Sequence, residues 1–369
     1  MSGAATSDRP ASTKDSSIET LRGLACILVV MAHSPGVGLV ALEYADDPWK
    51  FGLDLLAYLR MPLFTFLSGY VYAMRPVASG ASPMRFLRGK TRRLLLPMLV
   101  VGTLYILAIG LIPGWSTGGL RPVWVWHVIP VMHFWFIWAI FWCFLAIAFL
   151  DSRGWLSRRV WMFTAIGMIF VASSLLPKGH YTPASILGAL YLSLFFFAGI
   201  ACRRFHWRDA RRRWHALALG GFVLAFGATI VLDILDVPPS TDGWLGNLAG
   251  VLFCLLLVLV RVSSRPLQWI GAHSYAIFLL HFFFIQGCRS LLDALGIHDV
   301  TFSILSTTIV ALFGSIALER LFRRTRVTRF LILGQRWTPR SSSRAHSHGT
   351  SSPPPLNSAR PHTERIGDP

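Results

Sequence analysis

The sequence predicts an all-α integral membrane protein with about ten membrane-spanning helices and both termini in the cytoplasm. Of its 369 residues, 54% are hydrophobic and only 14% are charged, and the mean hydropathy is +0.54. An average soluble domain carries about 25% charged residues. The apolar residues gather in long runs, and the basic residues gather in alternate loops between those runs. Together these observations exclude an ordinary soluble domain.

Each apolar run has roughly the length of about 17–25 residues that crosses the hydrocarbon core of a bilayer. The predicted spans are 19–40, 51–74, 92–112, 132–150, 160–176, 184–202, 214–235, 243–261, 272–292 and 301–322. They form one membrane domain over residues 17–325. The segments 1–16 and 338–369 are polar, rich in Ser with Thr and Asp or with Pro, Arg and His, and we predict that both are disordered tails.

The charges in the loops orient these spans. One set of alternate loops is strongly basic and holds Arg75, Arg85, Arg88, Lys90, Arg153, Arg158, Arg159, Arg203, Arg204, Arg208, Arg211, Arg212, Arg213, Arg261 and Arg265. The other set has few basic residues, namely Lys50, Arg121 and Lys178. The positive-inside rule places the first set in the cytoplasm, and an even number of spans then places both termini there. The net charge of +18 therefore reflects topology, and no nucleic-acid-binding motif accompanies it.

The first span contains two ionisable residues, Arg22 and His33. Ser16 and Glu19 form the pattern of a capping box and predict where this helix begins. Eleven residues at about 100° each turn the helix by about 1100°, which is about 20° past three full turns. Arg22 and His33 therefore share one helix face, with Arg22 near the cytoplasm and His33 near mid-bilayer. His33 could act as a general base, or it could simply bond two helices together.

Other polar residues in the spans are weaker candidates for a site. His281 lies at a depth similar to that of His33, which suggests a shared polar chamber, whereas His133 begins its span at the outer surface. Asp54 could orient His33, although the two differ in depth. Ser68, in the segment FLSGY, could be a nucleophile, but Ser and the glycine after it more often serve close helix packing. The five cysteines lack metal-ligand spacing, so we expect no metal site.

The cytoplasmic run RFLRGKTRR precedes the third span and contains Arg88, Lys90, Arg92 and Arg93. A basic cluster here can be a topology signal that also attracts anionic lipid. It can equally be a clamp for a phosphorylated ligand, because guanidinium groups make paired hydrogen bonds to phosphate. The two interpretations are compatible.

The motifs occur in the order found in one known family. They are LRGLACILVVMAHS at the first span, MPLFTFLSGYVYA at 61–73, RRLLLPMLV at 92–100, HFWFIWAIF at 133–141 and SYAIFLLH at 274–281. With the ten apolar runs, this series resembles the membrane acyltransferase-3 family over residues 17–325. The opening arginine, ten residues and histidine are the most specific part of the resemblance.

The resemblance implies an O-acyltransferase of the inner or plasma membrane. Such an enzyme moves an acyl group, most often acetyl, from cytoplasmic acyl-CoA to a hydroxyl of a saccharide, glycolipid or metabolite, as in polysaccharide modification. It implies acyl-CoA as a co-substrate and no permanently bound cofactor. The family's essential arginine and histidine carry over onto Arg22 and His33. Its basic motif carries over loosely, because Lys90 stands where the family has the first arginine before Arg93.

Two other classes of protein fit part of the same pattern. A secondary transporter without acyl-transfer chemistry would also have many spans, polar residues within them and basic loops. It would more readily show helices broken by Gly and Pro at matching positions of two halves, and no internal repeat is evident. A structural membrane protein would use the polar residues only to pack helices. The pairing of Arg22 and His33 with a basic cytoplasmic cluster favours the acyltransferase.

Overall fold

The computed structural model describes residues 15–37, 40–77, 82–110, 122–176, 179, 182–235 and 243–337. The chain divides into the units 1–336 and 337–369, and every helix named below lies in the first. Of the predicted tails, residues 1–14 and 338–369 lie outside the described residues, as do the outer-loop residues Arg121 and Lys178.

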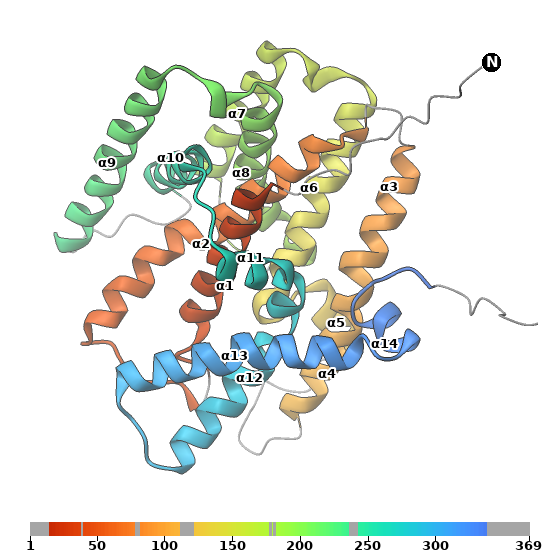
Figure 1. Cartoon of the computed structure of the whole chain (residues 1–369), viewed down its shortest axis with the longest axis vertical. Helices are drawn as coiled ribbons and strands as arrows, with labels where there is room; N and C mark the ends of the chain where they lie inside the picture. The colour runs from red at the N-terminus through yellow and green to blue at the C-terminus, as the bar shows by residue number, and fades with distance from the viewer. Residues whose placement is uncertain are drawn as a thin grey trace, which may run out of the picture. The chain divides into compact units, whose positions relative to one another are not determined.

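The described residues form helices and no strands. The α-helices are α1 (Ser16–His33), α2 (Pro48–Met74), α3 (Pro83–Lys90), α4 (Leu96–Gly110), α5 (Val123–Val128), α6 (Trp135–Ser152), α7 (Arg159–Leu175), α8 (Ile186–Arg204), α9 (Arg212–Ile234), α10 (Trp244–Val260), α11 (Arg265–Ala272), α12 (Ser274–Ala294), α13 (Val300–Phe322) and α14 (Arg326–Leu331). Their order can be followed by colour in Figure 1. The predicted all-α architecture is confirmed.

Each of the ten predicted apolar runs coincides with a helical stretch of the structure. Eight of these stretches are long and apolar enough to cross a membrane, including a continuous one over Pro83–Ala108. The other two, α7 and α10, are apolar helices of 17 residues each. The chain is therefore a multi-pass membrane protein, and the cytoplasmic position of its termini stays a prediction.

The first helix differs from the prediction at both ends. Asp15, not Ser16, caps α1, because its carboxylate accepts a hydrogen bond from the Ser17 amide at 3.1 Å. The helix ends at His33 and does not continue to residue 40. Pro35 follows closely, and Gly36 adopts the left-handed backbone conformation at φ 79° that helices commonly use to stop. His33 thus stands at the end of a helix, not in the middle of a longer one.

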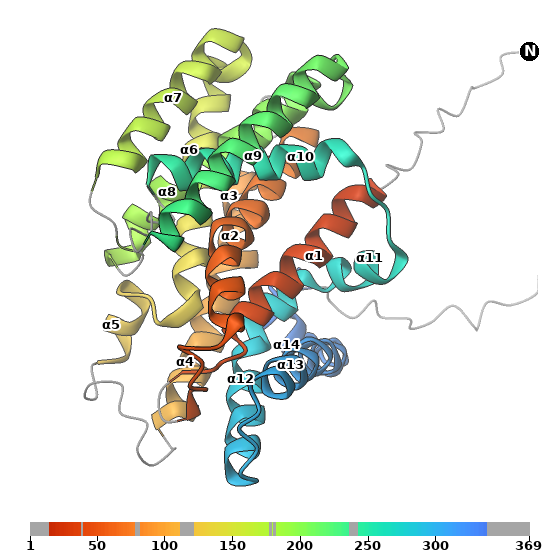
Figure 2. The same cartoon turned by 90° about the vertical axis from the view of Figure 1, so that its left-hand side faces the viewer.

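Close helix contacts are made where glycines meet backbone. A Cβ added to Gly69 of α2 would lie 2.0 Å from the carbonyl oxygen of Phe196 in α8, and one added to Gly199 would lie 2.0 Å from that of Phe66. Gly23 of α1 approaches α11 just as closely. Figures 1 and 2 show α1 beside α11, and α12 beside α13. The contact of Gly23 fixes α1, which carries Arg22 and His33, against α11, and the other two hold α2 against α8.

A buried ion pair, together with one hydrogen bond, joins α2, α6 and α8. Arg204 of α8 donates to the Asp151 carboxylate of α6 at 2.9 Å, and the Tyr72 hydroxyl of α2 donates to the same carboxylate at 2.8 Å. Asp151 is 3% exposed. A buried carboxylate is tolerated when it is fully paired in this way. These interactions hold α2, α6 and α8 together.

Candidate active site

Arg22 is held between its own helix and the start of α12. One guanidinium nitrogen, Nη1, donates to Glu19 Oε1 at 3.1 Å, and the other, Nη2, donates to Ser274 Oγ at 2.9 Å. These two contacts place the side chain in the wall of a cavity of about 540 Å³. The sequence-predicted arginine therefore faces a space that can hold a ligand.

The cavity is lined by both basic and apolar residues. Its basic residues are Arg22, Arg75, Arg85, Lys90, Arg92, Arg93 and Arg336. Its apolar residues include Phe64, Leu67, Phe136, Ile137, Ile140, Phe144 and Phe278. No acidic residue belongs to its described lining. A ligand that carries both negative charge and an apolar part matches this lining.

A π-helical turn, Thr91–Leu95 (η3), links α3 to α4 and carries two of the predicted basic residues. Such turns are rare and are often found at functional sites. Arg92 and Arg93 lie on this turn and Lys90 directly before it, and all three line the cavity. Lys90 Nζ lies 3.2 Å from the centre of the Phe144 ring. Arg88, which we also predicted at this site, does not line the cavity.

His33 presents one ring nitrogen to its own helix and leaves the other available. Its Nδ1 lies 2.8 Å from the carbonyl oxygen of Val29. Because a carbonyl oxygen only accepts, Nδ1 carries the hydrogen and Nε2 holds the lone pair. The His33 ring centre lies 5.4 Å from that of His281 and 4.9 Å from that of Phe282, both on α12. Arg22 and His33 therefore both face α12, in agreement with the predicted shared face.

The structure brings all three predicted histidines together. The ring centres of His133 and His281 are 4.8 Å apart, and His133 stacks on Phe282 at 4.6 Å. His281 Nδ1 lies 2.9 Å from the carbonyl oxygen of Phe278, so its Nε2 is also the bare nitrogen. His281 Nε2 and both nitrogens of His133 are buried and have no hydrogen-bond partner among the described residues. We call His33, His133 and His281 the histidine cluster.

His133 begins its span, as predicted, and its side chain is only 4% exposed and packs inside the bundle; its depth in the membrane stays a prediction. Residues 122–134 do not run straight out toward solvent. The short helix α5 folds against α4 and α6, with Thr103 Oγ1 3.0 Å from His127 Nε2 and Trp138 Nε1 donating to the His127 carbonyl oxygen at 2.8 Å. His133 follows α5 and is thereby drawn into the helix bundle.

An aromatic layer lies along the cavity and reaches the histidine cluster. Phe64, Phe136 and Phe278 all line the cavity, and their ring centres are 5.1–6.3 Å apart. Phe278 also contacts the histidine cluster, with its ring centre 5.3 Å from that of His133. None of the three histidines lines the cavity. Phe278 thus borders both the cavity and the histidine cluster, and we call the three packed rings the aromatic layer.

Two weaker candidates, Asp54 and Ser68, are not positioned to take part in the reaction. The side chain of Asp54 is 57% exposed and pairs with Lys50 one turn away, so it cannot orient His33. The difference in depth between Asp54 and His33 that the sequence predicts agrees with this placement. Ser68 lines the cavity, but its hydroxyl donates to the carbonyl oxygen of Phe64 at 2.9 Å within the same helix. That bond and the packing of Gly69 favour a structural role for this segment.

Two further groups near the site, Arg60 and His273, were not predicted from the sequence. Arg60 of α2 is close enough for its charge to act on the ring of His33, and its position inside an apolar run was the signal that could have revealed it. His273, which directly precedes α12, has Nδ1 2.6 Å from the buried carboxylate of Glu319 on α13. This bond anchors the start of α12 beside Ser274, the partner of Arg22. Among the described residues, no group of three or more His, Cys, Asp or Glu could hold a metal ion.

The fold and the cavity define a class: a multi-pass membrane protein with a basic, partly apolar cavity against its first helix. Comparison with known families makes the class more specific. A family model described as an acyltransferase domain matches residues 15–320, which is most of the chain. The chain therefore belongs to the acyltransferase-3 family and is a membrane acyltransferase. A search of curated proteins found no match.

Proposed function

We propose that this protein is an O-acyltransferase that moves an acyl group, most simply acetyl, from cytoplasmic acyl-CoA to a hydroxyl of a saccharide or glycan-type acceptor in the inner or plasma membrane. The observation that carries this proposal is the placement of α1. One face of this helix presents Arg22 to a basic cavity and His33 to the histidine cluster. Both residues of the family signature are thereby directed to the same partner helix.

The cavity matches the chemistry of the donor. Coenzyme A carries phosphates at one end and a thioester at the end of a long arm. Arg75, Arg85 and Arg93 line the cavity without an ion-pair partner among the described residues, so their guanidinium groups are available to phosphate. The apolar walls suit the arm and the acyl group. Arg22, next to these walls, would hold an oxygen of the donor or stabilise the charge that develops on the thioester carbonyl.

His33 supplies the base. Its Nε2 would take the proton of the acceptor hydroxyl while the hydroxyl oxygen attacks the thioester carbonyl carbon. The new C–O bond forms, the C–S bond breaks, and the coenzyme leaves as a thiolate that takes up a proton. The hydrogen bond from Nδ1 to Val29 keeps the ring in the tautomer that this step needs. His281 and His133 would contribute polar contacts to the acceptor hydroxyls.

The aromatic layer adds a requirement to this mechanism. Phe278 lines the cavity and contacts the histidine cluster, so its ring would turn aside to let the acyl carbonyl reach His33 Nε2. A layer of apolar rings would also keep water away from the thioester, which limits hydrolysis. We propose that this is its role during donor binding.

The test uses protein in membranes with radiolabelled acetyl-CoA, following both thiol release and label in the lipid and glycan extracts. His33→Gln should lower transfer by about 100- to 10,000-fold, the range for loss of a general base. His298→Gln changes an exposed histidine far along the chain and serves as the matched control. Transfer at the wild-type rate by the His33 variant would refute the assigned base. Absence of transfer by the wild type with every acceptor extract would refute the proposed function.

A further inference from the structure

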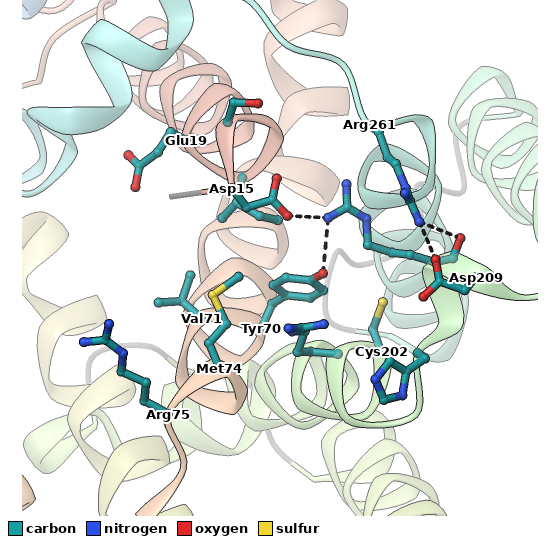
Figure 3. A pocket seen from close by; sticks show the side chains of 14 residues that line it. Asp15, Glu19, Tyr70, Val71, Met74, Arg75, Cys202, Asp209 and Arg261 are labelled. Carbon is teal, nitrogen blue, oxygen red and sulfur yellow. Dashed lines mark hydrogen bonds and ion pairs between the residues drawn. The ribbon is translucent and has the colours of Figure 1, made fainter. Parts of the chain in front are cut away.

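Figure 3 shows the side chains that line a second and larger cavity, of about 970 Å³. It is formed by the start of α1, the end of α2, the end of α8, the short turn η7 (Trp207–Asp209) and Arg261 directly after α10. All of these segments belong to the side of the bundle that the basic loops assign to the cytoplasm. The proposed mechanism gives this cavity no role.

The acidic residues in its wall are already occupied by arginines. The pairs are Asp15–Arg208 at 2.5 Å, Asp209–Arg261 at 2.6 Å and Glu19–Arg22 at 3.1 Å. Burial acts to raise the pKa of Asp15, but hydrogen bonds from Ser17 and Arg208 outweigh it and hold this pKa below its usual value. Each of these carboxylates is therefore paired with an arginine.

Two arginines of the wall remain without such a partner. Arg75 and Arg203 form no ion pair with any carboxylate in the described part of the chain, and Arg203 is only partly exposed. The guanidinium carbons of Arg203 and Arg208 lie 6.0 Å and 5.9 Å from the centre of the Tyr70 ring. Arg208 donates to the Tyr70 hydroxyl at 3.2 Å, and its Nε is buried without a partner in the described structure. The cavity thus has surplus positive charge that its own acids do not neutralise.

The two cavities meet at the end of α2. Val71 and Arg75 line both of them, so this helix end forms the border between them. Pockets of about 300–1,000 Å³ enclose drug-sized ligands, and coenzyme A, a nucleotide with three phosphates and a long arm, is larger than these. A cavity of about 540 Å³ that holds the thioester, the arm and the phosphates next to the arm leaves the rest of the nucleotide end outside. The adjoining cavity adds Arg203 to the arginines without an ion-pair partner among the described residues, and it shares Arg75 with the first cavity.

We propose that this second cavity binds the phosphorylated nucleotide of the acyl-CoA donor, with Arg203 and Arg75 contacting its phosphates and the arm crossing Val71 into the first cavity. The proposal rests on the proposed function for the identity of the donor. The recognised chemistry is a phosphate with two negative charges, which guanidinium groups bind by paired hydrogen bonds. An anionic lipid headgroup has related chemistry, and the experiment separates the two.

The probe is adenosine 3′,5′-bisphosphate, which has the phosphates of the nucleotide end but neither the arm nor a thioester. Its binding is measured by calorimetry on the full chain in nanodiscs of zwitterionic lipid. Arg203→Gln should weaken binding by about tenfold or more, as expected for loss of a charged hydrogen-bonding group. Arg211→Gln removes an exposed arginine that lines neither cavity and should bind as the wild type does.

Further measurements keep the proposal testable. Arg75→Gln changes an exposed side chain at the border, should also weaken binding, and replaces the Arg203 variant if that variant does not fold. Equal affinity of the wild type and both variants overturns the proposal. Stabilisation by phosphatidylglycerol that requires Arg203, with nucleotide binding unchanged, assigns the cavity to a lipid headgroup and also overturns it. Binding that depends on Arg203 in a protein without transfer activity would contradict the proposed function instead.

Discussion

Gly23→Ala should separate α1 from α11 and disturb Arg22. The added Cβ would lie 2.0 Å from the carbonyl oxygen of Leu267, whereas real Cβ contacts are essentially never under 3.0 Å. The two helices must therefore move apart by about 1 Å, because backbone cannot turn aside as a side chain can. A shift of that size would stretch the 2.9 Å hydrogen bond from Arg22 to Ser274 beyond the 3.5 Å limit for such a bond.

The cost of this overpacking is about 1–3 kcal/mol of unfolding free energy. Gly227→Ala on α9 is the matched control, because a Cβ there meets no atom within 4 Å. That substitution gains helix propensity alone, worth about 1 kcal/mol at most, so the two variants should shift stability in opposite directions. Denaturant titration in detergent measures stability, and acetyl transfer measures the effect on Arg22. A Gly23 variant as stable and as active as the wild type would refute this account of α1.

Three further results are expected. Phe278→Ala should raise transfer from butyryl-CoA relative to acetyl-CoA by opening the aromatic layer, whereas Phe141→Ala, outside the cavity, should leave the ratio unchanged in competition assays. Asp151→Asn should cost about 3–5 kcal/mol in denaturant titration, because Arg204 would lose its buried partner. The pKa of Asp15 is lowered in the folded state, so Asp15→Asn should destabilise the protein near neutral pH, and this difference should shrink as the pH falls through about 4. A pH-independent difference would contradict that assignment.

Much of the fold was predictable because its causes are local. The length of an apolar run is set by the bilayer, and the helical period alone places Arg22 and His33 on one face. The structure has a helix at each predicted run, and both residues face α12. The motif series predicted the family, which the match over residues 15–320 confirms. One local signal was misread at the cap of α1, where Asp15 acts in place of Ser16.

What the sequence determined by itself was the all-α membrane architecture, the family and the signature pair. The tertiary structure alone decided that His133 joins His33 and His281, that the aromatic layer reaches from the cavity to them, and that Asp54 stays on the surface. Hydropathy records which residues are buried, but it does not record how a helix is rotated or which helix it touches. Those choices depend on backbone contacts such as that between Gly23 and Leu267, which form only when distant segments pack together.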